Sequence, residues 1–357
     1  MQENDFTYQL FTISELEDWL FHNVENGLSD KVIARPRALA FVKNPHAKPD
    51  DPALVVVYNE NKEPVGYTGA FAEQWIRPSM PERFYWGSTQ WMDPQYRGKG
   101  VSGKMMRMIK DAVGDRYVAL DSSPASCRLD EKQGSVISYY PRYFFVFPGE
   151  NGKTRSIKAI AKGYLVRSAN IKALQRMGEY RYRNRYVNWI DDETYAFIVA
   201  HSENDLFLRQ QDYLNWQLRH PFLVSTGNDA NVELESCEFG GCVKRLNVQM
   251  VQVLVDSQLC GFYVLNLVDD RCTPLYLYYE ESKKEQVFAS LMSNVLCDKT
   301  IGRFRTFNKE LYEFSKWRGV HSMFSKNNIE QISLTVPGGF SVDASLHLQG
   351  GDGDMVC

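Results

Sequence analysis

The sequence predicts an α/β fold with a mixed (α+β) sheet, built as two tandem domains. Three observations support this prediction: runs typical of strands and helices alternate along the chain, a glycine-rich turn leads from a strand into a helix, and the same order of elements returns in the second half. A chain of 357 residues also exceeds one ordinary core. We therefore expect domains at 1–150 and 186–340, an inter-domain segment at 151–185 and a carboxyl-terminal tail at 341–357.

The first half contains both helical and strand-like patterns. Ser14 and Glu17 have the spacing of a capping box, which predicts that a helix begins at this point. Apolar residues at helical spacing predict a second helix over 105–112, and Pro124 and Gly134 favour the start and the end of a third. Runs rich in β-branched and aromatic residues predict strands at 53–58, 65–71, 84–92 and 117–120.

The second half repeats this order of elements. Asp256 and Ser257 separate two strand-like runs, which predicts a hairpin. The expected strands of this half are 248–255, 259–268, 273–279 and 304–307, and the expected helices are 206–218, 285–296 and 309–317. Glycine and aspartate dominate 349–354, a composition typical of a mobile tail.

The composition is that of a globular protein. Hydrophobic residues make up 44% of the chain, which is enough for stable cores. The formal net charge is -3, so the chain as a whole is not attracted to nucleic acid or to an anionic membrane, and we expect neither as a partner. The first residues lack the pattern of a signal peptide, and no apolar stretch is long enough to span a bilayer, which predicts a cytoplasmic protein.

The seven cysteines are scattered without paired short spacings, which is not typical of a disulfide framework. Cys237 and Cys242 have a spacing that suits half of a zinc site, but no second pair of cysteines or histidines follows at a matching distance. We therefore predict no metal site.

The most informative segment begins at Trp91 and reads WMDPQYRGKGVSGKMM. Glycines let the backbone approach an anion closely, and the first N–H groups of a helix add the positive end of its dipole. The segment therefore predicts a phosphate site that suits the pyrophosphate of an acyl-CoA. The P-loop pattern is absent, and so is a Gly-x-Gly-x-x-Gly run followed by a suitably spaced acid that would bind a ribose, which disfavours nucleotide hydrolases and Rossmann dehydrogenases.

This turn, with the strand before it and the helix after it, resembles the Arg/Gln-x-x-Gly-x-Gly/Ala signature of the GNAT acyltransferases. The resemblance covers 53–134, with one departure at Ser102, where the family prefers glycine or alanine. It implies that acetyl-CoA or another acyl-CoA is the donor, that backbone N–H groups of 98–103 hold its pyrophosphate, and that 91–93 pair with the pantetheine arm. The donor-binding residues implied in this way are Trp91, Met92, Asp93, Arg97, Gly98, Lys99, Gly100, Val101, Ser102 and Gly103.

The family's reaction is the attack of a neutral amine on a thioester, which needs a base for the amine proton and often an acid for the thiolate. Where the family often places a tyrosine, in the segment after the short strand, this chain has Asp130. Glu73, expected just past the hairpin strand, is the best-placed base candidate, although the sequence favours a solvated loop position for it. Tyr139 and Tyr140 are alternative proton donors on the next strand. His46 is expected to be exposed on a loop, outside the site.

The second module lacks the donor turn. Its central strand is followed by YEESKK, which has no glycine and has two carboxylates that would repel a pyrophosphate, so we expect this module to bind no CoA. Trp189, Tyr213 and Trp216 are expected in the core, or against an acceptor at the domain boundary. Arginines alternate with tyrosines over 176–186, a pattern that also occurs on nucleic-acid surfaces. Because the whole chain is acidic, a solvated strand face is the expected outcome.

These observations predict an N-acyltransferase that moves an acyl group, with acetyl as the expected one, from acyl-CoA to a primary amine of a small molecule or peptide. A CoA-binding sensor without turnover is an alternative that the missing family tyrosine favours. A transferase of related fold that uses aminoacyl-tRNA is a further alternative. The acceptor, the acyl length and the oligomeric state stay open.

Overall fold

The computed structural model describes residues 6–30, 32–74, 83–114, 116–148, 157–225, 242–323, 328–339 and 345–353. The elements of the first half are β1 (Thr7–Thr12), α1 (Ile13–His22), α2 (Arg35–Val42), β2 (Pro52–Tyr58), β3 (Pro64–Gln74), β4 (Arg83–Met92), the 3-10 helix η2 (Pro94–Tyr96), α3 (Val101–Val113), β5 (Tyr117–Leu120), α4 (Pro124–Lys132) and β6 (Val136–Val146). Those of the second half are α5 (Ile157–Met177), β7 (Arg183–Val187), α6 (Asp192–Ala200), α7 (Gln211–Arg219), β8 (Val224–Ser225), β9 (Cys242–Val243), β10 (Leu246–Val255), β11 (Gln258–Val268), β12 (Arg271–Tyr279), η3 (Glu281–Lys283), α8 (Lys284–Cys297), β13 (Arg303–Thr306), α9 (Lys309–Trp317) and β14 (Ile329–Val336).

Both halves follow one order of elements, which confirms the two-module fold expected from the sequence. Each has a strand, two helices, three consecutive antiparallel strands, a 3-10 turn, a helix, a strand, a helix and a last strand. The first set runs from β1 to β6, and the second from β7 to β14, with α5 between them. All of these strands except β8 and β9 join in one twelve-stranded sheet of order β1-β2-β3-β4-β5-β14-β6-β13-β12-β11-β10-β7.

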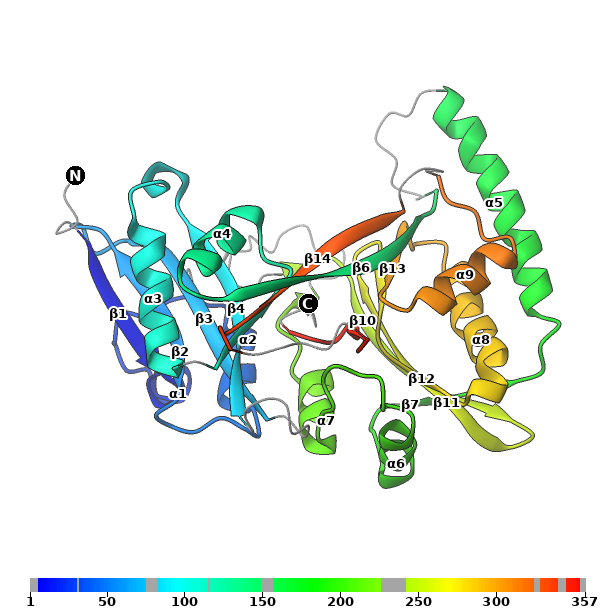
Figure 1. Cartoon of the computed structure of the whole chain (residues 1–357), viewed down its shortest axis with the longest axis horizontal. Coiled ribbons are helices and arrows are strands. Elements are labelled where there is room, and N and C mark those ends of the chain that lie inside the picture. Colours follow the sequence, from blue (N-terminus) through cyan, green and yellow to red (C-terminus); the bar gives the residue numbers. More distant parts are fainter. Residues whose placement is uncertain are drawn as a thin grey trace.

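The two halves exchange their last strands at the centre of this sheet. β14 lies between β5 and β6, while β6 lies between β14 and β13. The two strands pair antiparallel over 136–143 and 329–336 and cross the middle of the molecule (Figure 1). We call the side that holds β1 to β5 the amino-terminal lobe and the side that holds β7 and β10 to β13 the carboxyl-terminal lobe. Each lobe is therefore completed by a strand from the other half of the sequence.

Helices cover both faces of the sheet in each lobe. In the amino-terminal lobe, one core lies under α1 and α2 and includes Phe41 and Trp86, while a second core lies under α3 and includes Met105 and Ile109. In the carboxyl-terminal lobe, α5, α8 and α9 pack on one face and α6 and α7 on the other. The face that carries α1 and α2 also receives residues 206–222 from the second half, so that core joins the lobes.

Helix α1 begins two residues earlier than the capping pattern suggested. Thr12 is its N-cap: the Thr12 hydroxyl accepts a hydrogen bond from the Glu15 N–H at 3.3 Å, and the Glu15 carboxylate accepts one from the Thr12 N–H at 2.8 Å. The prediction of a capping box at Ser14 and Glu17 is therefore wrong. Strand β1 runs directly into the helix, so the turn into helical backbone falls at the strand's last residue and Ser14 lies inside the first turn.

Three further segments differ from the sequence-based expectations. The helix expected over 206–218 begins only at Gln211, and the region expected to link the domains contains the 21-residue helix α5. The tail was expected to be mobile, but its described residues 345–353 lie between the lobes (Figure 1). Asp352 has no exposed surface and pairs with the guanidinium of Arg209, which offsets the cost of burying its charge.

Candidate active site

A gap opens in the sheet between β4 and β5. These parallel strands pair only where they begin, with Tyr85 opposite Tyr117 and Trp86 opposite Val118. After that point β5 pairs with β14 on its other side, through Ala119 and Leu120, and β4 continues to Met92 without β5 beside it. A gap between diverging strands offers main-chain donors and acceptors to an extended ligand.

Two local features accompany the divergence. The register between β3 and β4 shifts at Gly69, so that Thr89 is skipped in the pairing and takes a φ of 20°. Gly87 lies against the ring of Tyr117, and a Cβ at Gly87 would lie 2.1 Å from the Tyr117 hydroxyl. The skipped residue Thr89 forms a β-bulge, which bends β4. Because Gly87 has no side chain, the ring of Tyr117 can lie across β4 at the start of the gap.

The glycine turn follows the free end of β4. Gly98 and Gly100 have φ values of 77° and 83°, a left-handed backbone that favours glycine, and a Cβ at either position would meet no atom within 4 Å. Gly100 is the N-cap of α3, and the N–H of Gly103 bonds to its carbonyl at 3.0 Å. Among the described residues, the N–H groups of Val101 and Ser102 have no backbone partner, as expected at a helix start. An exposed, positively polarised helix start with open space in front of it suits an anion.

The other residues expected at the donor site surround this turn. Trp91 stacks on Tyr67 with ring centroids 5.3 Å apart, and Met92 is buried. The side chain of Asp93 accepts a hydrogen bond from the N–H of Gln95 and so caps η2. The Arg97 Nε donates to the carbonyl of Met92 at 2.9 Å, which ties the turn to the end of β4. Lys99 is exposed beside the ring of Tyr96.

Asp130 is held by a cation from the neighbouring helix. Its carboxylate lies 2.6 Å from the ammonium of Lys110 on α3, which also donates to the Ser135 hydroxyl at 3.0 Å. Burial raises the pKa of Asp130, and the Lys110 hydrogen bond and charge act against that rise. Lys110 is nine residues along α3 from Val101, roughly 13 Å in an α-helix, so this pair lies well away from the glycine turn.

Glu73 is inside a strand and buried, whereas the sequence favoured a solvated loop. It belongs to β3 and is 1% exposed. Its carboxylate accepts a hydrogen bond from the indole of Trp86 and lies 2.9 Å from the Nε of Arg209. Burial raises the pKa of Glu73, while the charge of Arg209 lowers it. Glu73 therefore shares one face of the sheet with Trp86, which stands where the gap begins.

Arg209 is the centre of a buried polar cluster that sequence reasoning missed. Its guanidinium pairs with Glu73 of β3 and with Asp352 of the tail, and the side chains of all three are at most 2% exposed. The ring of Tyr213 on α7 lies 5.8 Å from the guanidinium carbon of Arg209 and stacks on His46 with centroids 5.1 Å apart. His46 is buried rather than exposed as expected, and burial lowers its pKa. No local pattern marks these residues, because they come from distant parts of the chain.

The tail reaches the point where β4 and β5 separate. A Cβ at Gly353 would lie 3.1 Å from the Cβ of Leu120 on β5 and 3.6 Å from the ring of Trp86 on β4. Gly353 has a φ of 69°, which favours glycine here. The carboxyl-terminal segment therefore covers the start of the gap on the face that carries Glu73.

Tyr139 and Tyr140 lie on opposite faces of β6, because successive residues of a strand alternate. Tyr140 is half-buried and packs against the core that contains Trp86. Tyr139 is 61% exposed on the other face. Only Tyr140 thus shares the face of Glu73 and the tail.

The corresponding turn of the second lobe is occupied by its own side chains. After β12, Lys284 pairs with Glu281 and lies 3.6 Å from Glu310, and the Tyr279 hydroxyl donates to Glu310 at 3.0 Å. The hydrogen bond to Glu281 raises the pKa of Lys284. The helix start therefore has carboxylates where the first lobe has open glycines.

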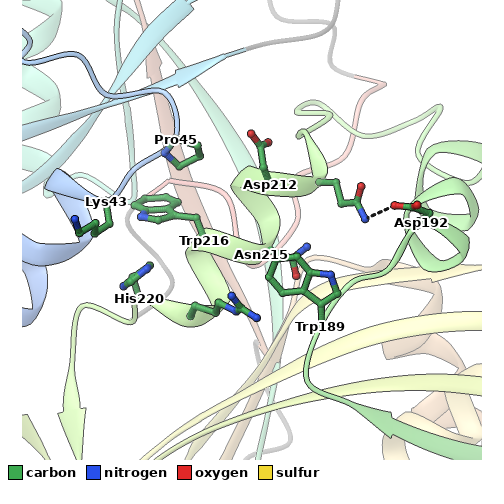
Figure 2. A pocket seen from close by; sticks show the side chains of 10 residues that line it. Lys43, Pro45, Trp189, Asp192, Asp212, Asn215, Trp216 and His220 are labelled. Carbon is green, nitrogen blue, oxygen red and sulfur yellow. Dashed lines mark hydrogen bonds between the residues drawn. The ribbon is translucent and has the colours of Figure 1, made fainter.

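A separate cavity of about 450 Å³ lies between α7 and the segment after α2. Figure 2 shows Lys43 and His220 on one side of it and Asp212 on another, with Trp216 between them and Trp189 across the cavity. Arg83, at the start of β4, donates to the carbonyl of His46 at 2.7 Å, next to the cavity wall. The ten residues of β4 span roughly 30 Å, so the cavity and the glycine turn lie near opposite ends of this strand.

Comparison with known proteins identifies the class of the first lobe. Residues 13–134 match the model of the acetyltransferase (GNAT) family. No curated protein sequence matches the chain significantly. The N-myristoyltransferase of Saccharomyces cerevisiae, solved with bound myristoyl-CoA and inhibitors, is 10% identical with a TM-score of 0.52, over 100% of this chain and 86% of that chain.

Two GCN5-related N-acetyltransferases are also similar. The protein from Kribbella flavida is 15% identical over 93% of this chain and 72% of its own, with a TM-score of 0.48. The protein from Sphaerobacter thermophilus is 11% identical over 97% of this chain and 100% of its own, also with a TM-score of 0.48. Residues 13–134 form a domain that matches the GNAT family. The whole chain has a two-lobed fold like that of N-myristoyltransferase.

In the described parts of the chain, no three His, Cys, Asp or Glu side chains gather as metal ligands would. Cys237 lies outside the described residues. None of the described helices is long and apolar enough to cross a bilayer.

Proposed function

We propose that this protein is an acyl-CoA-dependent N-acyltransferase with one donor site, in the amino-terminal lobe. The observation that carries the proposal is the open turn at Gly98 and Gly100, placed at the start of α3 and at the free end of β4. The pyrophosphate binds at this helix start, and the pantetheine arm extends along the edge of β4 into the gap. The thioester then lies near Trp86, where the two strands meet.

The reaction that follows is direct transfer. The nitrogen of a neutral primary amine attacks the thioester carbonyl carbon, an amide C–N bond forms, and the C–S bond breaks with its electron pair on sulfur. The amine nitrogen loses one proton to a base, and the thiolate of CoA gains one from an acid or from water. We propose an acetyl or another short acyl group as the cargo and a small molecule or peptide as the acceptor.

For the proton that reaches the thiolate, we propose Tyr140 as the donor. It lies on the face of the sheet that carries Trp86 and Glu73, whereas Tyr139 lies on the other face. Tyr140→Phe should lower kcat at least tenfold with little change in acetyl-CoA affinity, and it should change the alkaline limb of the pH profile. Tyr139→Phe is the matched control and should leave kcat unchanged. Equal effects of both variants would exclude this assignment.

The donor site is tested by acetyl-CoA binding to the wild type, Gly100→Glu and Gly134→Glu, measured by calorimetry. The two substitutions add the same charge. They also cause similar backbone strain, because both glycines have similar φ values, 83° and 86°, and a Cβ at either position would meet nothing within 4 Å. Only the carboxylate at residue 100 should repel the pyrophosphate. Binding lost in Gly100→Glu and kept in Gly134→Glu supports the site, and equal binding by all three excludes it.

A non-catalytic CoA sensor is the second candidate, and the ion pair between Asp130 and Lys110 favours it. Asp130 takes the place of the family tyrosine in sequence, and Lys110 holds its carboxylate. The two candidates differ in turnover. Release of free CoA from acetyl-CoA, followed over a panel of amino acids, amino sugars, polyamines and short peptides, supports the transferase. Tight binding with no release above the rate without protein supports the sensor.

A further inference from the structure

Three parts of the chain form the walls of the cavity between α7 and the segment after α2, and hydrogen bonds hold them together. The indole of Trp216 on α7 donates to the Ala40 carbonyl on α2 at 2.9 Å. The side chain of Asn215 accepts from the Ile190 N–H at 2.9 Å and donates to the Ile190 carbonyl at 3.0 Å, which fixes the segment that carries Trp189. The cavity is therefore preformed, and its volume of about 450 Å³ is within the range of small-ligand sites.

One side of helix α7 lines this cavity, through Asp212, Asn215, Trp216 and Arg219. At about 100° per residue these four fall within roughly 100° of one another around the helix axis. Asp212 is in the first turn and Arg219 is the last residue of the helix, so roughly 10 Å of helix separates their backbones. A carboxylate and a guanidinium therefore stand at opposite ends of this wall.

The cations of the cavity lie near one another. The guanidinium carbon of Arg219 lies 4.0 Å from the ring centre of Trp189, and Figure 2 shows Lys43 and His220 together on one side of Trp216. Burial lowers the pKa of His220, and the charges of Arg219 and Lys43 lower it further. Among the described residues, no carboxylate pairs with either cation. This part of the cavity therefore has a positive potential that an anion would offset.

The two carboxylates of the cavity lie elsewhere on its wall. Asp192 accepts a hydrogen bond from the Gln211 side chain at 3.1 Å, on the side away from Lys43 (Figure 2). Asp212 accepts from the N–H of Tyr213 at 2.8 Å. Burial lowers the pKa of His46, and the charge of Asp212 acts against that effect, so this carboxylate is close to His46. The cavity is therefore polarised, with cations on one side and carboxylates on the other.

We propose that this cavity binds a small organic anion that carries a flat apolar ring. The anionic group, a carboxylate or a phosphate, lies beside Lys43, Arg219 and His220, where it offsets their charge. The ring packs on Trp189, which is 40% exposed, because indole faces and stacked guanidinium groups both bind flat rings. A long polyanion fits less well, since Asp192 and Asp212 would repel its further charges.

This site is separate from the proposed donor site, because the cavity and the glycine turn lie near opposite ends of β4. The proposal therefore does not depend on acyl transfer, and binding alone tests it. The probes are indole-3-acetate, indole-3-acetamide and tryptamine, which share one ring and carry a negative charge, no charge and a positive charge. Their dissociation constants for the full chain are measured by ligand-observed NMR titration.

Two variants and a control are compared with the wild type. The first variant, Lys43→Gln/Arg219→Gln, removes the two cations, and the second, Trp189→Leu, removes the ring. The control, Lys299→Gln/Arg303→Gln, removes the same charge from exposed residues of the carboxyl-terminal lobe. Circular dichroism checks that each protein is folded.

The wild type should bind indole-3-acetate at least about tenfold more tightly than the amide, because charge-assisted hydrogen bonds form only with the acid. This preference should disappear in Lys43→Gln/Arg219→Gln and persist in the control, while Trp189→Leu should weaken the binding of both probes. Benzoate and phenyl phosphate, which share another ring, then show which anionic group is preferred.

Two results would overturn the proposal outright. The first is no binding of indole-3-acetate, benzoate or phenyl phosphate at about 10 mM, a concentration that would reveal even millimolar affinity. The second is an equal preference for the acid in the control and in Lys43→Gln/Arg219→Gln. Tighter binding of tryptamine than of indole-3-acetate, lost in Asp212→Asn, would overturn it in favour of an amine site.

Discussion

Arg209 pairs with Glu73 across the boundary between the two lobes, with Nε and Oε1 2.9 Å apart and neither side chain more than 2% exposed. The same guanidinium holds Asp352 of the tail. One buried cation therefore joins β3, the second half of the chain and the segment that covers the start of the gap. Breaking such a cluster by removing one partner is expensive, because it leaves uncompensated charge in the interior.

Arg209→Met should lower the free energy of unfolding by about 3–5 kcal/mol, because Glu73 and Asp352 would lose their shared cation. Urea denaturation measures this loss. The triple variant Arg209→Met/Glu73→Gln/Asp352→Asn removes the stranded charges and should regain part of the stability. If the triple variant is less stable than Arg209→Met, the cluster is not held by charge compensation.

Ionisation of the buried Asp205 should lower the stability as the pH rises from about 4 to about 7. Burial raises the pKa of Asp205 from 3.8 to about 7, and the charge of Asp352 adds to that rise. The folded state therefore binds more protons than the unfolded state between about pH 4 and pH 7, and stability decreases over this window by up to about 1.4 kcal/mol per pH unit for this group. In Asp205→Asn, the plot of unfolding free energy against pH should be flatter than in the wild type, so that the variant gains stability relative to the wild type at pH 8. Urea denaturation of both proteins from pH 4 to 8 measures this difference. An unchanged slope would assign the dependence to other groups.

The close approach of the tail to the sheet makes Gly353 sensitive to substitution. In Gly353→Val the new Cβ would lie 3.1 Å from Leu120, at a φ of 69°, so overpacking and backbone strain should together cost about 2–4 kcal/mol. Gly339→Val is the control, because it has a similar backbone strain, with a φ of 95°, and open space around it. Thermal denaturation of both variants should show the larger loss at residue 353. Equal losses would mean that strain alone accounts for the effect.

Most of the local structure could be predicted from the sequence. The hairpin of β10 and β11 turns at Asp256 and Ser257, which both take positive φ values, and the predicted strand 117–120 matches β5. Such patterns depend on neighbours a few residues away. The exchange of β6 and β14 could not be predicted, because their pairing joins residues almost 200 positions apart, and β14 has no neighbouring turn that would set its register.

The candidate site also has one part that the sequence predicts and one part that it does not. The glycine turn is a local pattern, and the structure gives Gly98 and Gly100 the left-handed backbone and open space that a phosphate cradle requires. The surroundings of Glu73 depend on Arg209 and Asp352, which are over 130 and over 270 residues further along the chain, so the sequence could not reveal that this carboxylate is buried and paired. A charged residue beside a predicted strand is compatible with either outcome.

The start of α1 provides a direct test of where the capping box lies. Thr12→Ala removes the hydroxyl that accepts from the Glu15 N–H, and it should cost about 1 kcal/mol of unfolding free energy. Ser14→Ala changes a hydroxyl of the same size two residues later, inside the first turn, and should stay within about 0.5 kcal/mol of the wild type. Urea denaturation of both variants measures the difference. Only one of these two hydroxyls can serve as the N-cap acceptor. A larger loss of stability in Ser14→Ala than in Thr12→Ala would therefore contradict the cap at Thr12 and would place the helix start where the sequence pattern suggested.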